Sequence, residues 1–229
     1  MKKYLWILAA AFLLQACSKD EEEGPYVPWR PGDDKEETID LDKATKVMIL
    51  TEQAKNRIVM IDQPTGKVAW EWTAADSGLS AAEQAWFDLP DEAKPVYNRT
   101  CVLVTASGGG VALIRIADKK AMFYAKPGGN PHSAEVLPDG NVVVASSTGN
   151  LLSVYVYNGA DSYVSRPAFT MPVHSAHNVV WDRKRGCLWT ATGAQLLKLA
   201  YNGKRTAPEL TQVRSYDCLL YTSPSPRDV

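Results

Sequence analysis

The chain has 229 residues, a formal net charge of −1 and 22% charged residues, a balance typical of a soluble globular body. Its lysine and arginine residues form no basic cluster, which argues against nucleic acid as a partner because phosphate binding requires concentrated positive charge. The length is sufficient for one sizeable hydrophobic core.

Residues 1–16 have the features of a secretory signal peptide. Lys2 and Lys3 precede an apolar run, Leu5–Leu14, which is too short to cross a bilayer comfortably. The run ends in Leu14-Gln15-Ala16-Cys17, which resembles the lipobox of bacterial lipoproteins. A plain signal peptide with an incidental cysteine is the alternative. We expect Cys17 to be lipidated and to anchor the protein to a membrane.

Residues 17–45 are rich in charge and proline and are predicted to form a flexible tether. The acidic run Ser18–Glu23 resembles a signal that sends lipoproteins of some Gram-negative gut anaerobes to the outer cell surface. A solvated charged tether is the simpler explanation, and both can hold together. We therefore expect an outer-membrane lipoprotein that faces the cell surface or the periplasm.

From Lys46 onward, short β-rich runs repeat at a regular spacing. His132 and His177 open similar segments 177 − 132 = 45 residues apart, and Cys101 and Asn141 begin similar segments 141 − 101 = 40 residues apart. A period of this length with four short strands is typical of a β-propeller blade. Residues 46–217 are predicted to be an all-β propeller with about four blades present of about six to eight.

Strands can be assigned to each expected blade. The first and second blades have three clear strands each, at 47–51, 57–61 and 68–72 and at 102–106, 112–116 and 121–124. A less clear first strand of the second blade is expected before Thr100. The third and fourth have four each, at 132–137, 142–147, 151–157 and 163–170 and at 177–182, 187–191, 196–201 and 210–216. The first blade lacks an inner strand, which we expect to come from the C-terminal part of the natural protein, because propellers commonly close in this way.

A long connection, Thr73–Tyr97, separates the first two blades. Within it, Ser80 and Glu83 have capping-box spacing and predict a short helix. We expect Trp86 to pack on the side of the propeller, and a loop on a ligand-binding face is the alternative.

The C-terminal residues 218–229 have an unusual origin. Cys218–Asp228 back-translates with ordinary codons into DNA that resembles a transposon end and adapter used to prepare sequencing libraries. We expect the natural coding sequence to have been cut near Asp217, so that the propeller is C-terminally truncated. A genuine terminus rich in proline and serine is the alternative. With Cys17 and Cys218 set aside, Cys101 and Cys187 are expected to be buried free thiols, too far apart for a disulfide.

The three histidines of the chain all lie in the repeat region. His132 and His177 open the predicted inner strands of adjacent blades, where side chains converge at the mouth of a propeller channel. Imidazoles are good ligands for a divalent transition metal, and His174 and Glu135 are within local reach. The alternative is that these side chains cap strand starts or hydrogen-bond between blades. The catalytic residues, if any, are unknown from the sequence.

Several segments together, including Asn56–Asp62, Ser107–Gly110, Pro131–Asn141, Ser146–Asn150 and Ala176–Asp182, resemble an uncharacterised family of bacterial lipoprotein propellers classed as a domain of unknown function. The likeness covers about Lys46 to Asn202 and implies a fold and a cellular location, but no activity. Two hypotheses follow. The first is a non-enzymatic platform that binds a glycan or a protein. The second is a metal-dependent lyase or hydrolase that uses His132 and His177, with a carboxylate or a tyrosine as the base.

Overall fold

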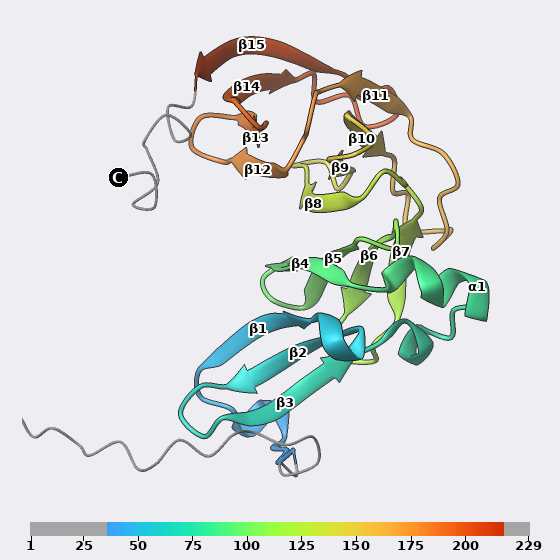
Figure 1. Ribbon diagram of the computed structural model, residues 1–229, viewed down its shortest axis with the longest axis vertical. Helices are drawn as coiled ribbons and strands as arrows, with labels where there is room; N and C mark the ends of the chain where they lie inside the picture. Colours follow the sequence, from blue (N-terminus) through green and yellow to red (C-terminus); the bar gives the residue numbers. More distant parts are fainter. Residues whose placement is uncertain (1–35, 218–229) are drawn as a thin grey trace, which may run out of the picture. The chain divides into compact units, whose positions relative to one another are not determined.

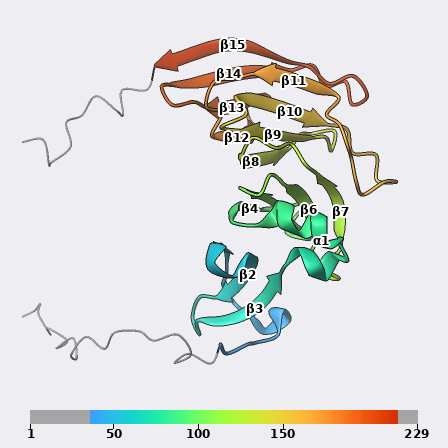
Figure 2. The ribbon, with the colours of Figure 1, turned by 45° about the vertical axis from the view of Figure 1, so that its right-hand side comes forward.

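A computed structural model of the protein describes residues 36–217. The predictions for the signal peptide, Cys17, most of the tether and the tail at 218–229 lie outside the described residues. Within residues 36–217, fifteen strands form four antiparallel sheets in chain order, which we call blades 1 to 4 (Figures 1 and 2). The described helices are short, and none has the length and apolar character needed to span a bilayer.

The strand bounds follow the hydrophobic runs of the sequence. Blade 1 contains β1 (Val47–Glu52), β2 (Arg57–Asp62) and β3 (Lys67–Trp72). Blade 2 contains β4 (Pro90–Val96), β5 (Cys101–Ala106), β6 (Val111–Arg115) and β7 (Ala121–Ala125). Blade 3 contains β8 (Pro131–Val136), β9 (Val142–Ser146), β10 (Leu151–Tyr155) and β11 (Phe169–Pro172). Blade 4 contains β12 (Asn178–Asp182), β13 (Cys187–Ala191), β14 (Gln195–Tyr201) and β15 (Leu210–Asp217).

The hydrophobic core is divided into three clusters, each between two neighbouring blades. Val- and Leu-rich second strands such as β5 and β9 are buried along their whole length, as expected for strands covered on both faces. Trp72 and Ile114 belong to the cluster between blades 1 and 2. Phe123 and Tyr155 belong to the next cluster, and Leu152 and Leu188 to the last. Stacked sheets with apolar faces between them therefore stabilise the fold.

The first strands of blades 2, 3 and 4 are the inner strands, and side chains link them directly. The Lys94 ammonium on β4 donates to Ser133 Oγ (3.2 Å) and Ala134 O (3.0 Å) on β8, and to Val179 O (2.9 Å) on β12. Glu92 accepts from Ala134 N (3.1 Å), and Ser133 Oγ accepts from Val179 N (3.1 Å). The inner strands β4 and β8 thus each place a side-chain acceptor on a backbone N–H of the following inner strand.

Blade 1 has no inner strand in the described residues, as predicted. Asn56, in the turn between β1 and β2, accepts from Leu89 N through its side-chain oxygen (2.8 Å). Asn150, in the turn between the second and third strands of blade 3, accepts from Ser175 N in the same way (2.8 Å). Both asparagines have a left-handed backbone, with φ of 49° and 53°. The turn after β1 therefore corresponds to the turn after β9, which makes β1 a second strand.

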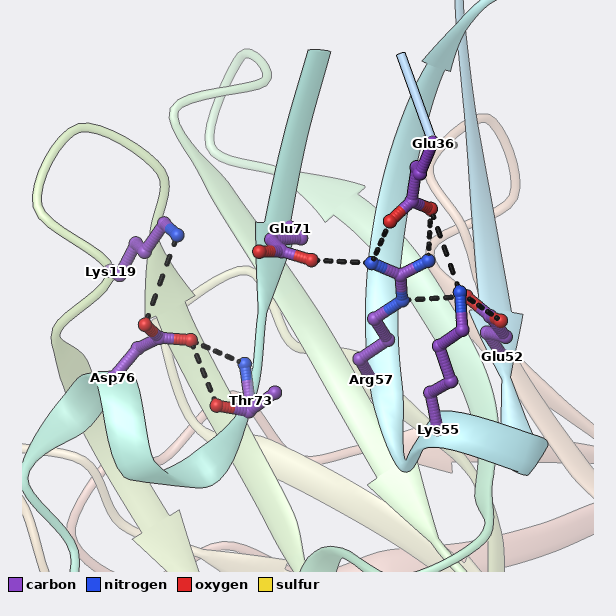
Figure 3. A network of polar contacts seen from close by, with 8 residues as sticks. All are labelled: Glu36, Glu52, Lys55, Arg57, Glu71, Thr73, Asp76 and Lys119. Atoms are coloured by element: carbon purple, nitrogen blue, oxygen red, sulfur yellow. Dashed lines mark hydrogen bonds and ion pairs between the residues drawn. The ribbon is translucent and has the colours of Figure 1, made fainter. Parts of the chain in front are cut away.

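The folded body begins ten residues earlier than the predicted boundary at residue 46 (46 − 36 = 10). Ile39 N donates to Val68 O (3.0 Å) and Val68 N to Glu37 O (2.9 Å), so this segment pairs with the outer edge of β3. The buried Arg57 guanidinium binds the carboxylates of Glu36, Glu52 (2.6 Å) and Glu71 (2.5 Å) (Figure 3). The end of the predicted tether is therefore part of blade 1.

Two other predictions need correction. β4 is the less clear first strand that we expected before Thr100, but its bounds place it inside the segment Thr73–Tyr97 that we predicted to be a connection. Its sequence, Pro-Asp-Glu-Ala-Lys-Pro-Val, lacks the apolar alternation of an ordinary strand, so the pattern did not indicate its bounds. The outer strand of blade 3 is Phe169–Pro172, not 163–170. Tyr163 instead forms an isolated parallel bridge with Tyr124 on β7. Proline at 167 and 172 and the turn-forming Asn158-Gly159 explain why the strand is short and late.

The predicted helix and thiols are confirmed. Ser80 is the N-cap of helix α1 (Ala81–Gln84), and Ser80 and Glu83 form the reciprocal bonds of a capping box. Cys101 and Cys187 are both buried and free.

Candidate functional site

The starts of the inner strands bring three polar side chains to corresponding positions. Each inner strand is preceded by a residue with positive φ: Leu89 (53°), Asn130 (55°) and Ser175 (49°). The second residue after each is Asp91, His132 or His177. Ser107 N donates to Leu89 O (2.9 Å) and Ser147 N to Asn130 O (3.0 Å), which supports the correspondence of the first two. We call Asp91, His132 and His177 the inner-strand site.

Irregular strand pairing sets the direction of two of these side chains. The register of β4 with β5 shifts between Pro90 and Glu92, and that of β8 with β9 shifts between Pro131 and Ser133. Asp91 and His132 are thus the extra residues of two β-bulges. A bulge redirects a side chain from the regular alternation of a strand and is frequent next to functional sites.

The two histidines lie face to face. Their ring centroids are 5.1 Å apart, and their planes differ by 12°. His177 Nδ1 lies 2.7 Å from the carbonyl oxygen of Ser175. Since a carbonyl oxygen can only accept, Nδ1 donates, and the Nε2 atom of the neutral ring keeps its lone pair. His177 is exposed, so this nitrogen is available to a ligand.

His132 is held between an amide and a carboxylate. Its Nε2 lies 3.1 Å from Asn130 Nδ2, and its Nδ1 lies 3.8 Å from Asp91 Oδ1. With the amide as donor, Nε2 accepts and the hydrogen of the neutral ring is on Nδ1, on the side of Asp91. Asp91 Oδ2 in turn accepts from Ser107 Oγ (2.9 Å). The site therefore forms a polar row, contributed by blades 2, 3 and 4.

Unsatisfied polar atoms lie beside this row. In the described part of the chain, Asn130 Oδ1 and Ser146 Oγ are buried without a hydrogen-bond partner. Ser146 pairs with Pro131, the residue before His132. Buried polar groups normally have a partner, so these two atoms offer hydrogen bonds to water or to a ligand at the start of β8.

The predicted metal ligands are brought together only in part. His132 and His177 are neighbours, but the Glu135 carboxylate accepts from the backbone N–H of Val136 (3.0 Å) and of Trp181 (3.4 Å), and His174 is exposed. Within residues 36–217, no group of three or more His, Cys, Asp or Glu side chains is placed to hold a metal ion. Because imidazole lone pairs lie in the ring plane, two nearly parallel rings cannot aim at one ion unless one ring turns. The metal site stays a prediction.

Asp91 is the site residue that the sequence reasoning missed. It was overlooked because the first strand of blade 2 was expected before Thr100 without definite bounds. The spacing contained a signal, since Asp91 precedes His132 by 132 − 91 = 41 residues, close to the spacing already found in that part of the chain. Pro90-Asp91 also matches Pro131-His132 in having a proline before the polar residue.

A second candidate surface is a cluster of three aromatic rings, Trp86, Tyr124 and Tyr163, which we call the aromatic cluster. Ring centroids are 5.9 Å apart for Trp86 and Tyr163, and 5.2 Å for Tyr124 and Tyr163. Tyr163 is 42% exposed. Backbone bonds fix it on β7, since Tyr124 N donates to Ser162 O (2.7 Å) and Val164 N to Tyr124 O (3.0 Å). The exposed ring therefore extends from a backbone segment that is bonded to β7.

Charged groups border the aromatic cluster. The Tyr124 hydroxyl donates to Glu83 Oε1 (2.8 Å), and the Lys126 ammonium lies 5.2 Å from the centroid of the Trp86 ring. Hydrogen bonds from Ser80 hold the pKa of Glu83 below its usual value, so the carboxylate is ionised at neutral pH. Burial and the bond to Glu83 raise the pKa of Tyr124 to about 12. The cluster thus combines an exposed ring with a carboxylate and a cation.

A hollow of about 640 Å³ lies elsewhere, between the N-terminal segment and β3. Its lining includes Glu36 and Glu71, whose carboxylates already bind Arg57. It shares no lining residue with the inner-strand site or the aromatic cluster. We assign no ligand to it.

Comparison with known proteins agrees with the fold. The chain superposes on solved structures of hydrazine synthase from Kuenenia stuttgartiensis (TM-score 0.52, 16% identity, 79% of this chain and 48% of that one) and of the mitotic checkpoint complex (TM-score 0.55, 11% identity, 74% and 48%). It also superposes on a humanized mutant of the Chaetomium thermophilum Polycomb repressive complex 2 (TM-score 0.57, 7% identity, 79% and 46%). The chain spans about half the length of these structures. No curated protein matches it.

These likenesses and the four successive antiparallel sheets define a protein of the β-propeller class, as predicted. The model of a family of unknown function, DUF6528, matches residues 1–222, and the chain belongs to this family. The expected membership in a family of unknown function is thereby confirmed. The number of blades in the natural protein, its bacterial origin and its lipid anchor stay predictions.

Proposed function

We propose that this protein is a membrane-anchored lipoprotein whose β-propeller is a binding platform for a glycan or a protein ligand. The observation that carries the proposal is the aromatic cluster, in which the exposed Tyr163 ring lies beside the Trp86 and Tyr124 rings, and Glu83 and Lys126 border the cluster. Sugar rings present an apolar C–H face that packs on aromatic rings, and their hydroxyl groups bond to charged side chains. A rigid ring with a polar border suits that chemistry.

Affinity electrophoresis in gels that contain soluble polysaccharides tests the glycan ligand. We expect a polysaccharide such as xylan, galactomannan or mixed-linkage glucan to retard the protein. Tyr163→Ala abolishes this retardation, because the exposed ring is lost. The matched control is Tyr216→Ala, which removes a similarly exposed tyrosine (40%) on β15. Equal retardation of both variants would contradict this location of the site, and no retardation in any gel would leave a protein as the only proposed ligand class.

The anchor is proposed from the sequence alone. Cys17 follows an apolar leader and precedes the acidic, proline-rich tether, which would hold the propeller away from an outer membrane. Cell fractionation of a Cys17→Ser variant tests this. The unchanged protein stays with the membrane pellet and incorporates labelled fatty acid, whereas the variant does neither. Membrane retention of the variant would contradict a lipid anchor on Cys17.

A metal-dependent lyase or hydrolase is the second candidate, and the juxtaposition of His132 and His177 favours it. In this proposal the two imidazoles hold a divalent transition metal ion, and the nearby Asp91 carboxylate is the candidate base. The ion would polarise a substrate oxygen or activate water. One ring must turn for both nitrogens to reach the same ion, and further donors must join them.

A further inference from the structure

The Asp91 carboxylate of the inner-strand site is enclosed, but little balances its charge. Its side chain is only 11% exposed. Within residues 36–217 it accepts one hydrogen bond, from the neutral Ser107 hydroxyl (2.9 Å), and no lysine or arginine forms an ion pair with it. His132 Nδ1 lies 3.8 Å away, which is beyond hydrogen-bond length. Enclosing a charge without a partner costs free energy, so this position favours the arrival of a cation.

Neighbouring carboxylates that are similarly enclosed have the partner that Asp91 lacks. Asp182 is 16% exposed and pairs with Arg185 (2.9 Å). Glu92 is 27% exposed and pairs with Lys94 (3.1 Å). Because Glu92 directly follows Asp91 on β4, the position on this strand does not by itself explain the difference. The bulge that turns Asp91 out of the regular alternation of β4 also separates it from the lysine.

The other free hydrogen-bonding atoms of the inner-strand site can all act as acceptors. His177 Nε2 keeps its lone pair, because Nδ1 donates to Ser175 O (2.7 Å). Asn130 Oδ1 is buried without a partner in the described part of the chain, and so is Ser146 Oγ, a hydroxyl that can accept or donate. A site that is rich in acceptors and carries a negative charge suits a ligand that donates hydrogen bonds and is positively charged.

The directions of these acceptors distinguish an organic cation from a metal ion. A metal ion requires lone pairs that converge on one point, and the planes of the His132 and His177 rings differ by only 12°. Asp91 and Asn130 also lie at opposite nitrogens of the His132 ring, at 3.8 Å and 3.1 Å. The acceptors are therefore spread along a row. An ammonium group with hydroxyl groups beside it donates hydrogen bonds at several points of such a row without turning either ring.

We propose that the inner-strand site binds a hydroxylated primary amine, the chemistry of an amino sugar, with its ammonium group on Asp91 and a hydroxyl group on His177 Nε2. His177 is exposed and the His132 side chain is 31% exposed, so the ligand reaches the row from solvent. This ligand is an alternative to the metal ion at the two histidines. The inference goes beyond the polysaccharide proposed for the aromatic cluster and does not depend on it.

Isothermal titration calorimetry of the full chain with glucosamine, in the presence of EDTA, tests this inference. We expect glucosamine to bind at least about tenfold more tightly than glucose and N-acetylglucosamine, which keep most of the hydroxyl groups but lack the ammonium group. Equal binding of the three sugars would overturn the proposal, and so would the absence of binding of both glucosamine and ethanolamine up to about 10 mM. Binding that requires added Zn²⁺ would assign the site to a metal and overturn it equally.

The variant Asp91→Asn keeps the size of the side chain and an acceptor for Ser107, but removes the charge. We expect its affinity for glucosamine to fall at least about tenfold. Its melting temperature without ligand should rise, because a charge without a partner is gone. A lower melting temperature than that of the unchanged protein would mean that the charge already has a stabilising partner, and this result would overturn the proposal.

The matched control is Asp88→Asn. It removes an exposed carboxylate three residues before Asp91, which accepts from Asn56 Nδ2 (3.1 Å). This variant should change the affinity for glucosamine by less than about twofold, because water screens an exposed charge. Similar affinities of Asp88→Asn and Asp91→Asn for glucosamine would overturn the assignment to Asp91.

The variant Tyr163→Ala separates this site from the aromatic cluster. It should bind glucosamine as the unchanged protein does. Loss of glucosamine binding in Tyr163→Ala would place the amine at the aromatic cluster and overturn the proposal. Failure of every polysaccharide to retard the protein would leave glucosamine binding at Asp91 unaffected, so the two proposals fail separately.

Discussion

The imidazole rings of His132 and His177 lie face to face at 5.1 Å, although 45 residues separate them in the sequence (177 − 132 = 45). The repeat explains the contact, because the two residues occupy the same position in consecutive inner strands. A ligand at this surface meets side chains from three blades at once, since Asp91 adds the corresponding position of blade 2. Sites built in this way depend on the relative placement of the blades.

The metal hypothesis for this pair predicts a stability change. If His132 and His177 bind Zn²⁺, added Zn²⁺ raises the melting temperature of the unchanged protein, and His132→Ala combined with His177→Ala removes the rise, because bound ligand stabilises the folded state. Differential scanning fluorimetry with and without Zn²⁺ measures this effect, and mass spectrometry detects a bound metal. The site would be excluded if the purified protein contained no transition metal and if added Zn²⁺ changed the melting temperatures of the unchanged protein and of the double variant equally.

Lys94 is predicted to be important for stability. Its ammonium bonds to two neighbouring inner strands and pairs with Glu92 (3.1 Å), and it is only 23% exposed. Lys94→Met leaves two carbonyl oxygens and a carboxylate without their partner. We expect a loss of about 2–3 kcal/mol in the free energy of unfolding, measured by urea denaturation.

Two further variants distinguish the loss of the bonds made by Lys94 from a general effect of removing a lysine charge on stability. Lys43→Met removes an exposed ion pair with Asp40, with 68% and 67% of the two side chains exposed, and should change stability by less than about 0.5 kcal/mol. Glu92→Gln combined with Lys94→Met should recover part of the loss, because the uncompensated carboxylate is gone. If Lys94→Met and Lys43→Met lowered the free energy of unfolding by similarly small amounts, the stabilising role of Lys94 would be contradicted.

The sequence predicted the repeating parts of this fold better than its exceptions. Blade 4 follows its predicted strands within about one residue, because each strand is a separate apolar run between turn residues. The bounds of β4 were not predicted, because Asp91, Glu92 and Lys94 bond to neighbouring inner strands and loops. A strand whose polar residues have such tertiary partners has the same local sequence pattern as a loop.

The candidate site was also predicted in part. The spacing of the histidines indicated that His132 and His177 open adjacent inner strands. His132 lies on β8, His177 lies directly before β12, and their rings are neighbours. The stacking of the two rings depends on ring orientation. The separate hydrogen bonds of Glu135 depend on β12 lying beside β8. Of the aromatic cluster, only Trp86 was expected to pack on the propeller, and it does pack against the core. Its contacts with Tyr124 and Tyr163 were not predicted, because the three rings come from segments without a common spacing.

Acid should release the N-terminal segment from blade 1. The hydrogen bond from Arg57 holds the pKa of Glu36 below its ordinary value of 4.5. A lowered folded pKa means that the ionised form stabilises the folded state above about pH 4.5, and that this contribution is lost as pH falls through the folded pKa. We expect the amide signals of Ile39 and Val68 to shift together below pH 4.5 in NMR spectra.

Two variants test the assignment to Glu36. Glu36→Gln removes the titration, so the signals of Ile39 and Val68 should no longer change in this pH range. Lys67→Met removes the neighbouring exposed pair with Glu37 (2.8 Å) and should leave the transition in place. If the N-terminal segment were released at the same pH in Glu36→Gln, another carboxylate would be responsible for the transition.

Gly129 is predicted to tolerate no side chain, in contrast to its neighbour Gly128. Both residues have positive φ, 62° and 69°. A Cβ atom at Gly128 meets nothing within 4 Å, whereas one at Gly129 would lie 2.6 Å from Gly149 Cα and 2.7 Å from Gly149 N. Gly129 O also accepts from Gly149 N (3.0 Å), which fixes the approach of the segment before His132 to the turn after β9.

Alanine substitutions at these two positions therefore separate backbone strain from close packing. Gly128→Ala should cost about 1–2 kcal/mol in unfolding free energy, the price of positive φ alone. Gly129→Ala adds a backbone clash, so we expect a loss of more than about 3 kcal/mol in urea denaturation. It should also displace His132, visible as a changed chemical shift of its ring. Equal losses in the two variants would mean that the contact between Gly129 and Gly149 does not hold the inner-strand site in place.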